Sequence, residues 1–314
     1  MSAATEQSSK QGGSWFSRLS TKWKVAVVFG GMVAVALIIN VLAPSAGRNN
    51  EFKPQNEFKL EPWINLKIGP VDMSINRAVF YLFLASALTV GTMIYIARRM
   101  QDKPNRVQTA VEAAYDLTKN IAGGNMDGKM ATRWFPFVAT LFFFIWWSNM
   151  IGYLPLPTSH ETVDIFGVAV PSLAIYAATA NLSIPLVLAL IVWLAYHYEG
   201  VRTQGVRGYI ASWIPAGVTG FARFPIFLIE AISQFVRLIS LSVRLFANIL
   251  AGHLLILFMA GGLVVLLGIA ALGVFTLPMA IVFFAFEIVL IATLQAFIFA
   301  TLTSIYLGGA TTQH

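Results

Sequence analysis

The chain has 314 residues, of which 57% are hydrophobic and 11% charged, and its mean hydropathy is +0.72. A soluble domain has about a quarter of its residues charged, so this composition excludes an ordinary soluble enzyme, and the high apolar content excludes disorder. The net charge is +7, but the basic residues flank apolar runs or lie singly within them, which argues against nucleic-acid binding. Because the chain has no cysteine, disulfides and cysteine-ligated metals are excluded. The composition predicts a polytopic membrane protein.

The N-terminal quarter contains one apolar run between two polar segments. Residues 1–24 form a polar tail rich in Ser, Gln and Gly, and the run at 25–43 is just long enough to cross a hydrocarbon core of about 30 Å. A cleaved signal peptide is the alternative for this run, but its length favours a retained membrane anchor. Residues 44–77 contain four prolines and mixed charge, so we expect an external loop there.

Three shorter apolar runs follow, at about 78–97, 134–154 and 171–197. The connector at 98–133 carries seven basic residues, which by the positive-inside rule places it on the cytoplasmic or matrix side. Apolar residues at helical spacing within it predict an amphipathic helix on the membrane surface from Pro104 to Ile121. The loop between the second and third runs has no basic residue and is placed outside. These assignments put the N-terminus inside.

The C-terminal third consists of two apolar stretches that exceed the membrane thickness. We expect long helices at about 221–273 and 277–307, because no proline interrupts the 52 residues between Pro225 and Pro278. As one helix, residues 226–260 alone would be about 52 Å long, so this helix must lie strongly tilted in the membrane or break. The predicted fold class is therefore all-α, a polytopic membrane protein with about five to six membrane helices, of which the two long C-terminal ones are strongly tilted.

A polar stripe runs along the first of these long helices. Glu230, Arg237 and Arg244 are spaced seven apart, so each step drifts by only about 20° and all three share one face. The uncharged polar residues on or beside that face are Ser233, Gln234, Ser240 and Asn248. A charged side chain at mid-membrane costs about 2.5–3.5 kcal/mol on insertion scales. Either Glu230 and Arg237 form a structural pair or snorkel to an interface, or the stripe is a hydrated path to a fixed charge at Arg244, whose guanidinium stays protonated.

His253 and Glu287 are the other ionisable residues of this region. Between Arg244 and the last residue they are the only histidine and the only formal charge, and intramembrane ionisable groups are functional candidates. On a regular helix His253 lies about 180° round from Arg244, which predicts two separate polar access routes with Arg244 between them. A metal site is the rival interpretation, but one His and one Glu without a third ligand are weak grounds for it.

Three motifs resemble those of a known family. Residues 240–253 (SLSVRLFANILAGH) resemble the signature of subunit a of the F-type ATP synthase, residues 294–299 (LQAFIF) resemble its C-terminal motif, and residues 149–155 (NMIGYLP) resemble a third. The likeness covers roughly residues 58–308 in order. It implies that residues 78–314 form the proton-channel domain of the membrane stator subunit, which conducts protons together with a rotating ring of c subunits and couples the proton gradient to ATP synthesis.

The resemblance also implies a role for each polar residue. Arg244 is the essential stator charge that faces the carboxylates of the ring. The other implied proton-path positions are Glu230, Ser233, Arg237, Ser240, Asn248, His253, Glu287 and Gln295. The further implied partners are subunit b of the peripheral stalk, the other ATP synthase subunits and the lipid membrane, with no nucleic acid, metal or cofactor, and the chain on its own is not an enzyme. The implied location is a bacterial plasma membrane, with the mitochondrial inner membrane as second choice.

The sequence departs from the family pattern in three places. Leu238 stands where a proline is expected, which puts a local helix bend in question. Gln295 lies eight positions after Glu287, one more than in the family pattern. On a regular helix this turns Glu287 about 80° from Gln295 unless a π-bulge absorbs the extra residue. The run at 25–43 is additional to the family core.

Electrostatics gives the implied mechanism. A ring carboxylate is protonated while it faces lipid, ionises beside the positive charge of Arg244 and regains a proton from the second half-channel. Two other classes remain as alternatives. A self-contained ion-coupled secondary transporter or channel would predict an internal repeat and a midplane site, and the sequence shows neither. A non-conducting scaffold would not need Arg244, His253 and Glu287. Both H⁺ and Na⁺ remain open as the coupling ion.

Overall fold

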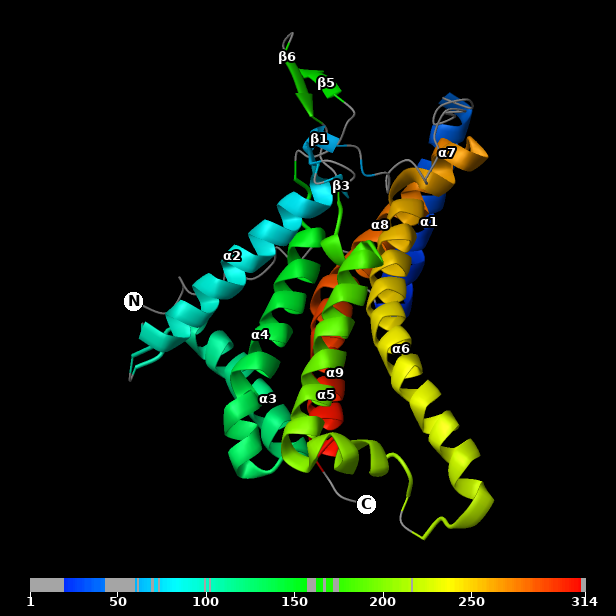
Figure 1. Ribbon diagram of the computed structural model, residues 1–314. Coiled ribbons are helices and arrows are strands. Elements are labelled where there is room, and N and C mark those ends of the chain that lie inside the picture. The colour runs from blue at the N-terminus through cyan, green and yellow to red at the C-terminus, as the bar shows by residue number, and fades with distance from the viewer. Residues whose placement is uncertain are drawn as a thin grey trace, which may run out of the picture. The chain divides into compact units, whose positions relative to one another are not determined.

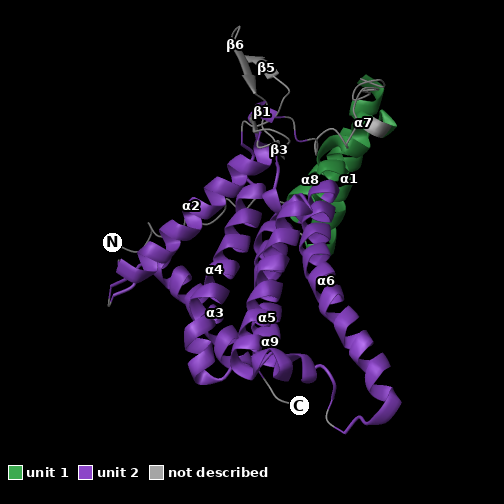
Figure 2. Ribbon diagram, in the orientation of Figure 1, with its two compact units in different colours: residues 1–54, 256–282 green, residues 55–255, 283–314 purple. Residues whose placement is uncertain are grey.

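The computed structural model of the chain is built almost entirely of helices (Figure 1). It describes residues 20–42, 60, 62–68, 71–72, 74–98, 100–101, 103–156, 162–165, 168–171, 175–215 and 217–311. Within these ranges, six helical segments are long and apolar enough to cross a membrane, which confirms the predicted all-α, polytopic class. The chain divides into two units (Figure 2): residues 1–54 with 256–282, and residues 55–255 with 283–314.

The smaller unit pairs the first helix with a later helical hairpin. α1 (Thr21–Leu42) contains most of the apolar run at 25–43 and packs against the 3₁₀ turn η6 (Ala270–Leu272). Phe29 and Phe275 contact each other there, with ring centroids 5.9 Å apart. The hairpin consists of the π turn η5 (Phe258–Gly262), α7 (Leu263–Leu267), η6 and the start of α8 (Gly273–Phe286). α7 ends at Gly268, whose φ of 66° is a left-handed conformation that glycine adopts without strain.

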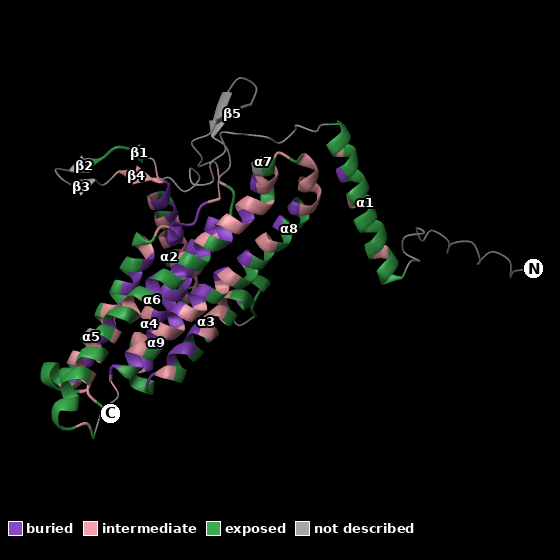
Figure 3. Ribbon diagram, turned by 90° about the vertical axis from the view of Figure 1, so that its right-hand side faces the viewer, coloured by how far each residue is buried: buried purple, intermediate pink, exposed green. Residues whose placement is uncertain are grey.

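The larger unit is a helical bundle with α4 near its centre. Its helices are α2 (Arg77–Arg98), α3 (Arg106–Asn125), α4 (Gly128–Gly152), the 3₁₀ turn η3 (Ala178–Ala180), α5 (Ser183–Ala211), the 3₁₀ turn η4 (Gly220–Ala222), most of α6 (Arg223–Leu257), the π turn η7 (Glu287–Ile291) and α9 (Ala292–Gly309). α4 packs against α2, α3 and α9, and α9 also packs against α3 and α5. Figure 3 shows the buried residues gathered on the facing sides of these helices. Small residues permit the close packing, because a side chain at Gly308 would meet the backbone carbonyl of Asn125.

Three short antiparallel strand pairs lie in the described parts of the loops. β1 (Pro62–Ile64) pairs with β4 (Ile75–Asn76), β2 (Lys67–Ile68) with β3 (Val71–Asp72), and β5 (Thr162–Ile165) with β6 (Val168–Pro171). These segments were expected to be loops, since strands of two to four residues are too short to show an alternating pattern. Much of the external loop predicted at 44–77 lies outside the described residues.

Two helices differ in their bounds from the sequence-based expectation. The amphipathic helix expected from Pro104 to Ile121 is α3, which starts after Asn105 because that side chain accepts a hydrogen bond from the backbone N–H of Gln108 at 2.7 Å. The run expected at 171–197 is α5, which begins later and continues to Ala211. Its direction changes at Gly205, where φ is 73°. Because α5 extends beyond the apolar run, hydropathy alone did not show where this helix ends.

α6 is a single helix of 35 residues, which corresponds to a length of about 52 Å. Leu238 lies within it, and the helix continues through this position without the proline that would have bent it. α6 gives way to the π turn η5 and then α7, so the helix expected at 221–273 is divided near its end. The strong tilt of this helix in a membrane stays a prediction.

Candidate functional site

Arg244 lies on an exposed face of α6. Ser240 and Asn248, one turn before and one turn after it, are exposed on the same side. Among the described residues, no carboxylate pairs with the Arg244 guanidinium. Behind it, Arg244 shares a narrow crevice with the buried Gln295 of α9. The structure thus brings three predicted polar positions to the side of a fixed positive charge that is open to a partner.

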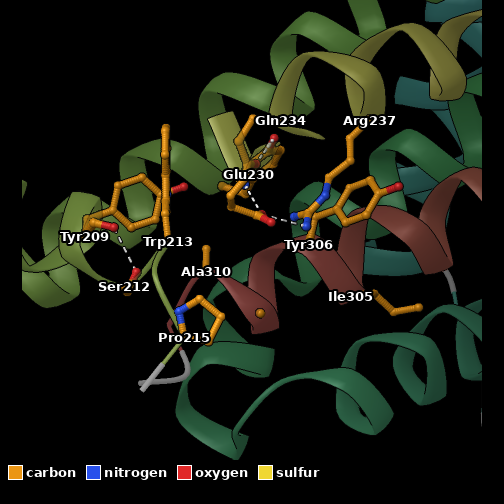
Figure 4. A pocket seen from close by; sticks show the side chains of 12 residues that line it. Tyr209, Ser212, Trp213, Pro215, Glu230, Gln234, Arg237, Ile305, Tyr306 and Ala310 are labelled. Atoms are coloured by element: carbon orange, nitrogen blue, oxygen red, sulfur yellow. Dashed lines mark hydrogen bonds and ion pairs between the residues drawn. The ribbon is translucent and has the colours of Figure 1, made fainter. Parts of the chain in front are cut away.

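A second polar group lies nearer the start of α6 and lines a cavity of about 450 Å³ between α5, α6 and α9 (Figure 4). Arg237 forms an ion pair with Glu230 at 3.0 Å. Gln234 donates to the same Glu230 oxygen at 2.8 Å and accepts from the Tyr196 hydroxyl at 2.9 Å. The Arg237 guanidinium also lies over the Tyr306 ring, 5.6 Å from its centroid. Glu230 is therefore held in place by charge and hydrogen bonds while one side of it faces the cavity.

A third polar group lies near the other end of α6. His253 is buried, and its ring packs against that of Tyr153 with centroids 4.7 Å apart. The Tyr153 hydroxyl donates a hydrogen bond of 2.9 Å to the buried carboxylate of Glu287. His253 and Glu287 are thus connected through Tyr153, which neither the charge pattern nor the spacing predicted.

Both ring nitrogens of His253 face backbone carbonyls. Nδ1 lies 2.9 Å from the carbonyl of Ile249 and Nε2 lies 3.2 Å from that of Gly152. Carbonyls only accept hydrogen bonds, and a neutral imidazole has one N–H, so the ring donates to both carbonyls only as imidazolium. The site therefore accommodates an additional proton on His253 without a change of partners.

Gly252 and a π turn allow Glu287 to reach this position. A side chain at Gly252 would collide with the Glu287 carboxyl group, so the glycine leaves room for the carboxylate against the α6 backbone. Glu287 is the first residue of the π turn η7, which is the feature that could absorb the extra residue before Gln295. Glu287 and Gln295 are both buried.

The two polar groups lie on opposite sides of Arg244 along α6. Glu230 precedes Arg244 by fourteen residues, or about 21 Å of helix, and His253 follows it by nine, or about 14 Å. The last predicted position, Ser233, is half-buried. Neither Ser233 nor Ser240 makes a side-chain hydrogen bond among the described residues.

The residues that sequence analysis missed are uncharged. Tyr153 contacts both His253 and Glu287, Tyr196 donates to Gln234, and the Tyr306 ring lies beneath the Arg237 guanidinium. Aromatic residues are frequent throughout the chain, and these three showed no distinguishing pattern of charge or spacing. Tyr153 and Gly252 do fall inside quoted motifs, which was the available signal for them. In the described part of the chain, no three side chains of His, Asp or Glu are grouped so that they could hold a metal ion.

Comparison with known proteins places the chain among ATP synthase subunits. The sequence model of the family described as ATP synthase A chain matches residues 79–308. A protein from Rubrobacter xylanophilus named ATP synthase subunit a is 36% identical over 250 residues, which cover 79% of this chain and 88% of the relative. Relatives of the same name from Hyphomonas neptunium and Maricaulis maris are 31% and 33% identical, each over 82% of this chain and over 95% and 96% of their own lengths.

The matched residues run from the start of α2 to the end of α9 and include all three polar groups, while α1 precedes them. The match, the bacterial relatives and the six apolar helices lead to one conclusion: the chain belongs to the ATP synthase A chain family, the membrane subunit of ATP synthase that acts in proton transport.

Proposed function

We propose that the chain conducts protons through two offset half-channels at its interface with a rotating ring of c subunits, and that this flow couples the proton gradient to ATP synthesis. The observation that supports the proposal most is the placement of two polar groups on opposite sides of the exposed Arg244 along α6. One continuous polar path would let protons cross without turning a rotor. Two separated groups with a fixed charge between them require a carrier that moves from one to the other.

The outer half-channel is formed by Glu287, Tyr153 and His253. Tyr153 donates to Glu287 through its hydroxyl and stacks on His253 through its ring, so one side chain contacts both groups that exchange protons. His253 and Glu287 are both ionisable side chains, whose burial in an apolar helix is energetically unfavourable. This favours a role in transport over a role in packing. By the charge of the loops this group lies on the outer side.

Arg244 acts on the ring rather than on this chain. A carboxylate that faces lipid stays protonated, because its ionised form is too costly there. When it arrives beside Arg244, the positive charge favours the ionised form, so the proton leaves. An arginine suits this role because its guanidinium is not deprotonated in proteins, so it does not itself relay protons between the half-channels.

The inner half-channel is the cavity beside Glu230. Its volume leaves room for several water molecules, and Glu230, Arg237 and Gln234 form a polar wall whose side chains are fixed by one another. A proton released from the ring passes along this wall to the side on which the basic connectors lie.

The face of α6 around Arg244 is suited to a helical partner. Its exposed residues Ser240, Ala247 and Ala251 are small, and small residues let helices approach closely within a membrane. We assign this face to the c-ring. Subunit b and the other ATP synthase subunits complete the complex, the chain has no catalytic activity of its own, and the bacterial relatives favour a bacterial plasma membrane.

Passive proton flux through the assembled complex in vesicles tests the proposal. His253→Ala and Glu287→Ala should each lower the flux at least about tenfold at matched protein levels, since each removes a proton-exchanging group. Glu112→Ala is the matched control and should leave the flux unchanged. Glu112 lies on α3, where its carboxylate accepts a hydrogen bond from Gln108, away from both polar groups. Wild-type flux in both test variants would overturn the assignment.

A further inference from the structure

The position of Glu287 depends on a local change of helix geometry. Gln295 lies eight positions after it, and on a regular α-helix their side chains would point about 80° apart. Both are nonetheless buried, with 6% and 4% of their surface exposed. The π turn η7 (Glu287–Ile291) accounts for this, because it takes up one residue and returns the helix to the register of a seven-residue spacing.

Three hydrogen-bond donors from α4 and its C-terminal cap contact this turn and the residues directly after it. They lie at positions i, i+3 and i+7 of the chain and therefore share one helix face. The three hydrogen bonds run from Trp146 Nε1 to Thr293 Oγ1 at 3.2 Å, from Asn149 Nδ2 to the Ala292 carbonyl at 3.4 Å, and from Tyr153 Oη to Glu287 Oε2 at 2.9 Å. They bracket the turn, since one contacts its first residue and two contact the residues that follow its last.

Asn149 is the most constrained of the three donors. Its side chain is fully buried, as is Ala292, and a buried amide without partners is costly. Thr179 donates to Asn149 Oδ1 at 2.8 Å, which orients the amide so that Nδ2 faces the Ala292 carbonyl. The amide therefore has a defined partner on each side, one from η3 and one from the first residue after the π turn.

We propose that Asn149, oriented by Thr179 and assisted by Trp146, is a positioning residue that holds the extra residue of the C-terminal helix in the π turn and thereby keeps Glu287 beside Tyr153. The proposal rests on the proposed role of Glu287 in proton transfer. Without the amide, the turn relaxes toward a regular α-helix, which rotates Glu287 relative to Gln295 and away from its partner.

The test compares four forms of the subunit in the whole complex: the natural chain, Asn149→Leu, a deletion of Val289, and both changes together. Leucine keeps the branching at Cγ and the number of side-chain heavy atoms and removes the amide. Val289 lies within the π turn with 72% of its surface exposed, so its deletion removes no packed side chain. The deletion places Glu287 seven residues before Gln295, about 20° apart on a regular helix, so the π turn and its support are no longer needed.

We expect Asn149→Leu alone to lower passive proton flux about threefold to tenfold, the range that one interhelical hydrogen bond supports. The deletion alone should retain flux, and Asn149→Leu should have no further effect in the deletion background. An equal loss in both backgrounds, as expected if Asn149 only lines a channel or packs the bundle, would overturn the proposal, and so would unchanged flux in Asn149→Leu alone.

A second measurement reports the geometry without relying on Glu287 chemistry. A side chain at Gly252 would lie against the Glu287 carboxyl group, and the chain has no cysteine, so the pair Gly252→Cys and Glu287→Cys can be joined by a short thiol crosslinker. Crosslinking should fall when Asn149→Leu is added and return when Val289 is also deleted. Unchanged crosslinking in the presence of Asn149→Leu would overturn the proposed role of Asn149 in holding the helix register. Normal flux in Glu287→Ala together with the expected crosslinking would overturn only the proposed role of Glu287 in the proton path.

Matched variants separate the proposal from a loss of folding. Ser148→Ala changes the adjacent buried polar residue of α4, whose hydroxyl has no hydrogen-bond partner among the described residues, and it should change neither flux nor crosslinking. If Asn149→Leu does not assemble, Thr179→Val replaces it. That variant keeps the amide and removes the hydroxyl that orients it, and its effect should likewise disappear in the deletion background.

Discussion

Arg244 is a charged residue that the structure leaves open to a partner. It is exposed on the small-residue face of α6 and has no acidic partner among the described residues. We expect Arg244→Ala to abolish ATP-driven proton pumping, because a ring carboxylate then has no positive charge that favours release of its proton. Arg244→Lys should fail as well, since a partly desolvated ammonium loses its proton more readily and lacks the planar set of donors.

Pumping and passive leak, measured separately in vesicles, distinguish these outcomes. Normal pumping by the alanine variant would contradict the proposed function. Normal pumping by the lysine variant alone would show that the site requires only a positive charge and not a guanidinium.

Gly252 provides a prediction that depends on space and not on charge. An alanine within a helix is ordinarily more stable than a glycine by roughly 0.5–1 kcal/mol, but at this position the added methyl group meets the Glu287 carboxyl group. Gly252→Ala should therefore destabilise the subunit by about 1–3 kcal/mol and lower proton flux. Gly124→Ala on α3 is the control, since a side chain there meets no atom of the described residues within 4 Å. Thermal unfolding should show changes of opposite sign for the two variants.

Tyr153 tests the connection between His253 and Glu287. Tyr153→Phe keeps the ring that stacks on His253 and removes the hydroxyl that donates to Glu287. We expect proton flux to fall about tenfold, equivalent to about 1.4 kcal/mol, the scale of one hydrogen bond to a charged group. Tyr198→Phe, at an exposed position of α5, should leave flux unchanged. An equal effect of both variants would argue against a specific role for the Tyr153 hydroxyl.

Charge is what made some site residues predictable and others not. Arg244, His253 and Glu287 stood out because an ionisable group in an apolar helix is costly and needs an explanation. Tyr153 joins the last two but carries no charge, and its role follows from the arrangement of α4, α6 and η7, which one sequence does not reveal. The same holds for Tyr196, which reaches the buried Gln234 across the bundle.

At the scale of elements, length and period were the informative signals. Hydropathy predicted about five to six membrane helices, and six helical segments of the described residues are long and apolar enough. The spacing of Glu287 and Gln295 left two alternatives, a rotated Glu287 or a π-bulge, and the structure has the π turn η7 at this position. The bounds of α5 and the short strand pairs did not follow. A helix continues past its apolar run where tertiary packing supports it. The change of direction at Gly205 requires a φ of 73°, which a glycine in the sequence permits but does not require.

The length of α6 leads to a prediction about its orientation. At 35 residues, or about 52 Å, it is far longer than a hydrocarbon core of about 30 Å requires. We expect its axis to lie more than about 40° from the membrane normal, beyond the usual range of spanning helices. An experimental structure of the complex in a lipid bilayer gives this angle directly, and a smaller angle without a break before Gly261 would contradict the prediction.

At the scale of the whole molecule, the proposed function depends on the separation of the two proposed half-channels. Each proton that crosses 100 mV supplies about 2.3 kcal/mol, so several must be pooled through the rotor for one ATP. A direct path between the two polar groups would dissipate that energy. The apolar residues around Arg244, among them the buried Leu241, Leu245 and Ile249 of α6, provide the barrier, and they belong to the same core that holds the bundle together.

The final prediction concerns which side each half-channel faces. From the basic connector at 98–133 and the positive-inside rule, we expect α3 and the cavity beside Glu230 to face the inner side. Ser212 lines that cavity, and Ser183 is exposed at the opposite end of α5. Because the chain has no cysteine, Ser212→Cys and Ser183→Cys each give a single reactive site on this subunit.

A membrane-impermeant maleimide applied to vesicles of known orientation should label Ser212→Cys only from the inner face and Ser183→Cys only from the outer face. Ser148→Cys, buried within α4, is the control and should react from neither. Labelling with both sides exchanged would invert the direction of the proposed proton path while leaving its two halves intact. Labelling of Ser212→Cys from both faces would show a continuous aqueous passage, which the fixed charge of Arg244 and the apolar barrier around it are proposed to prevent.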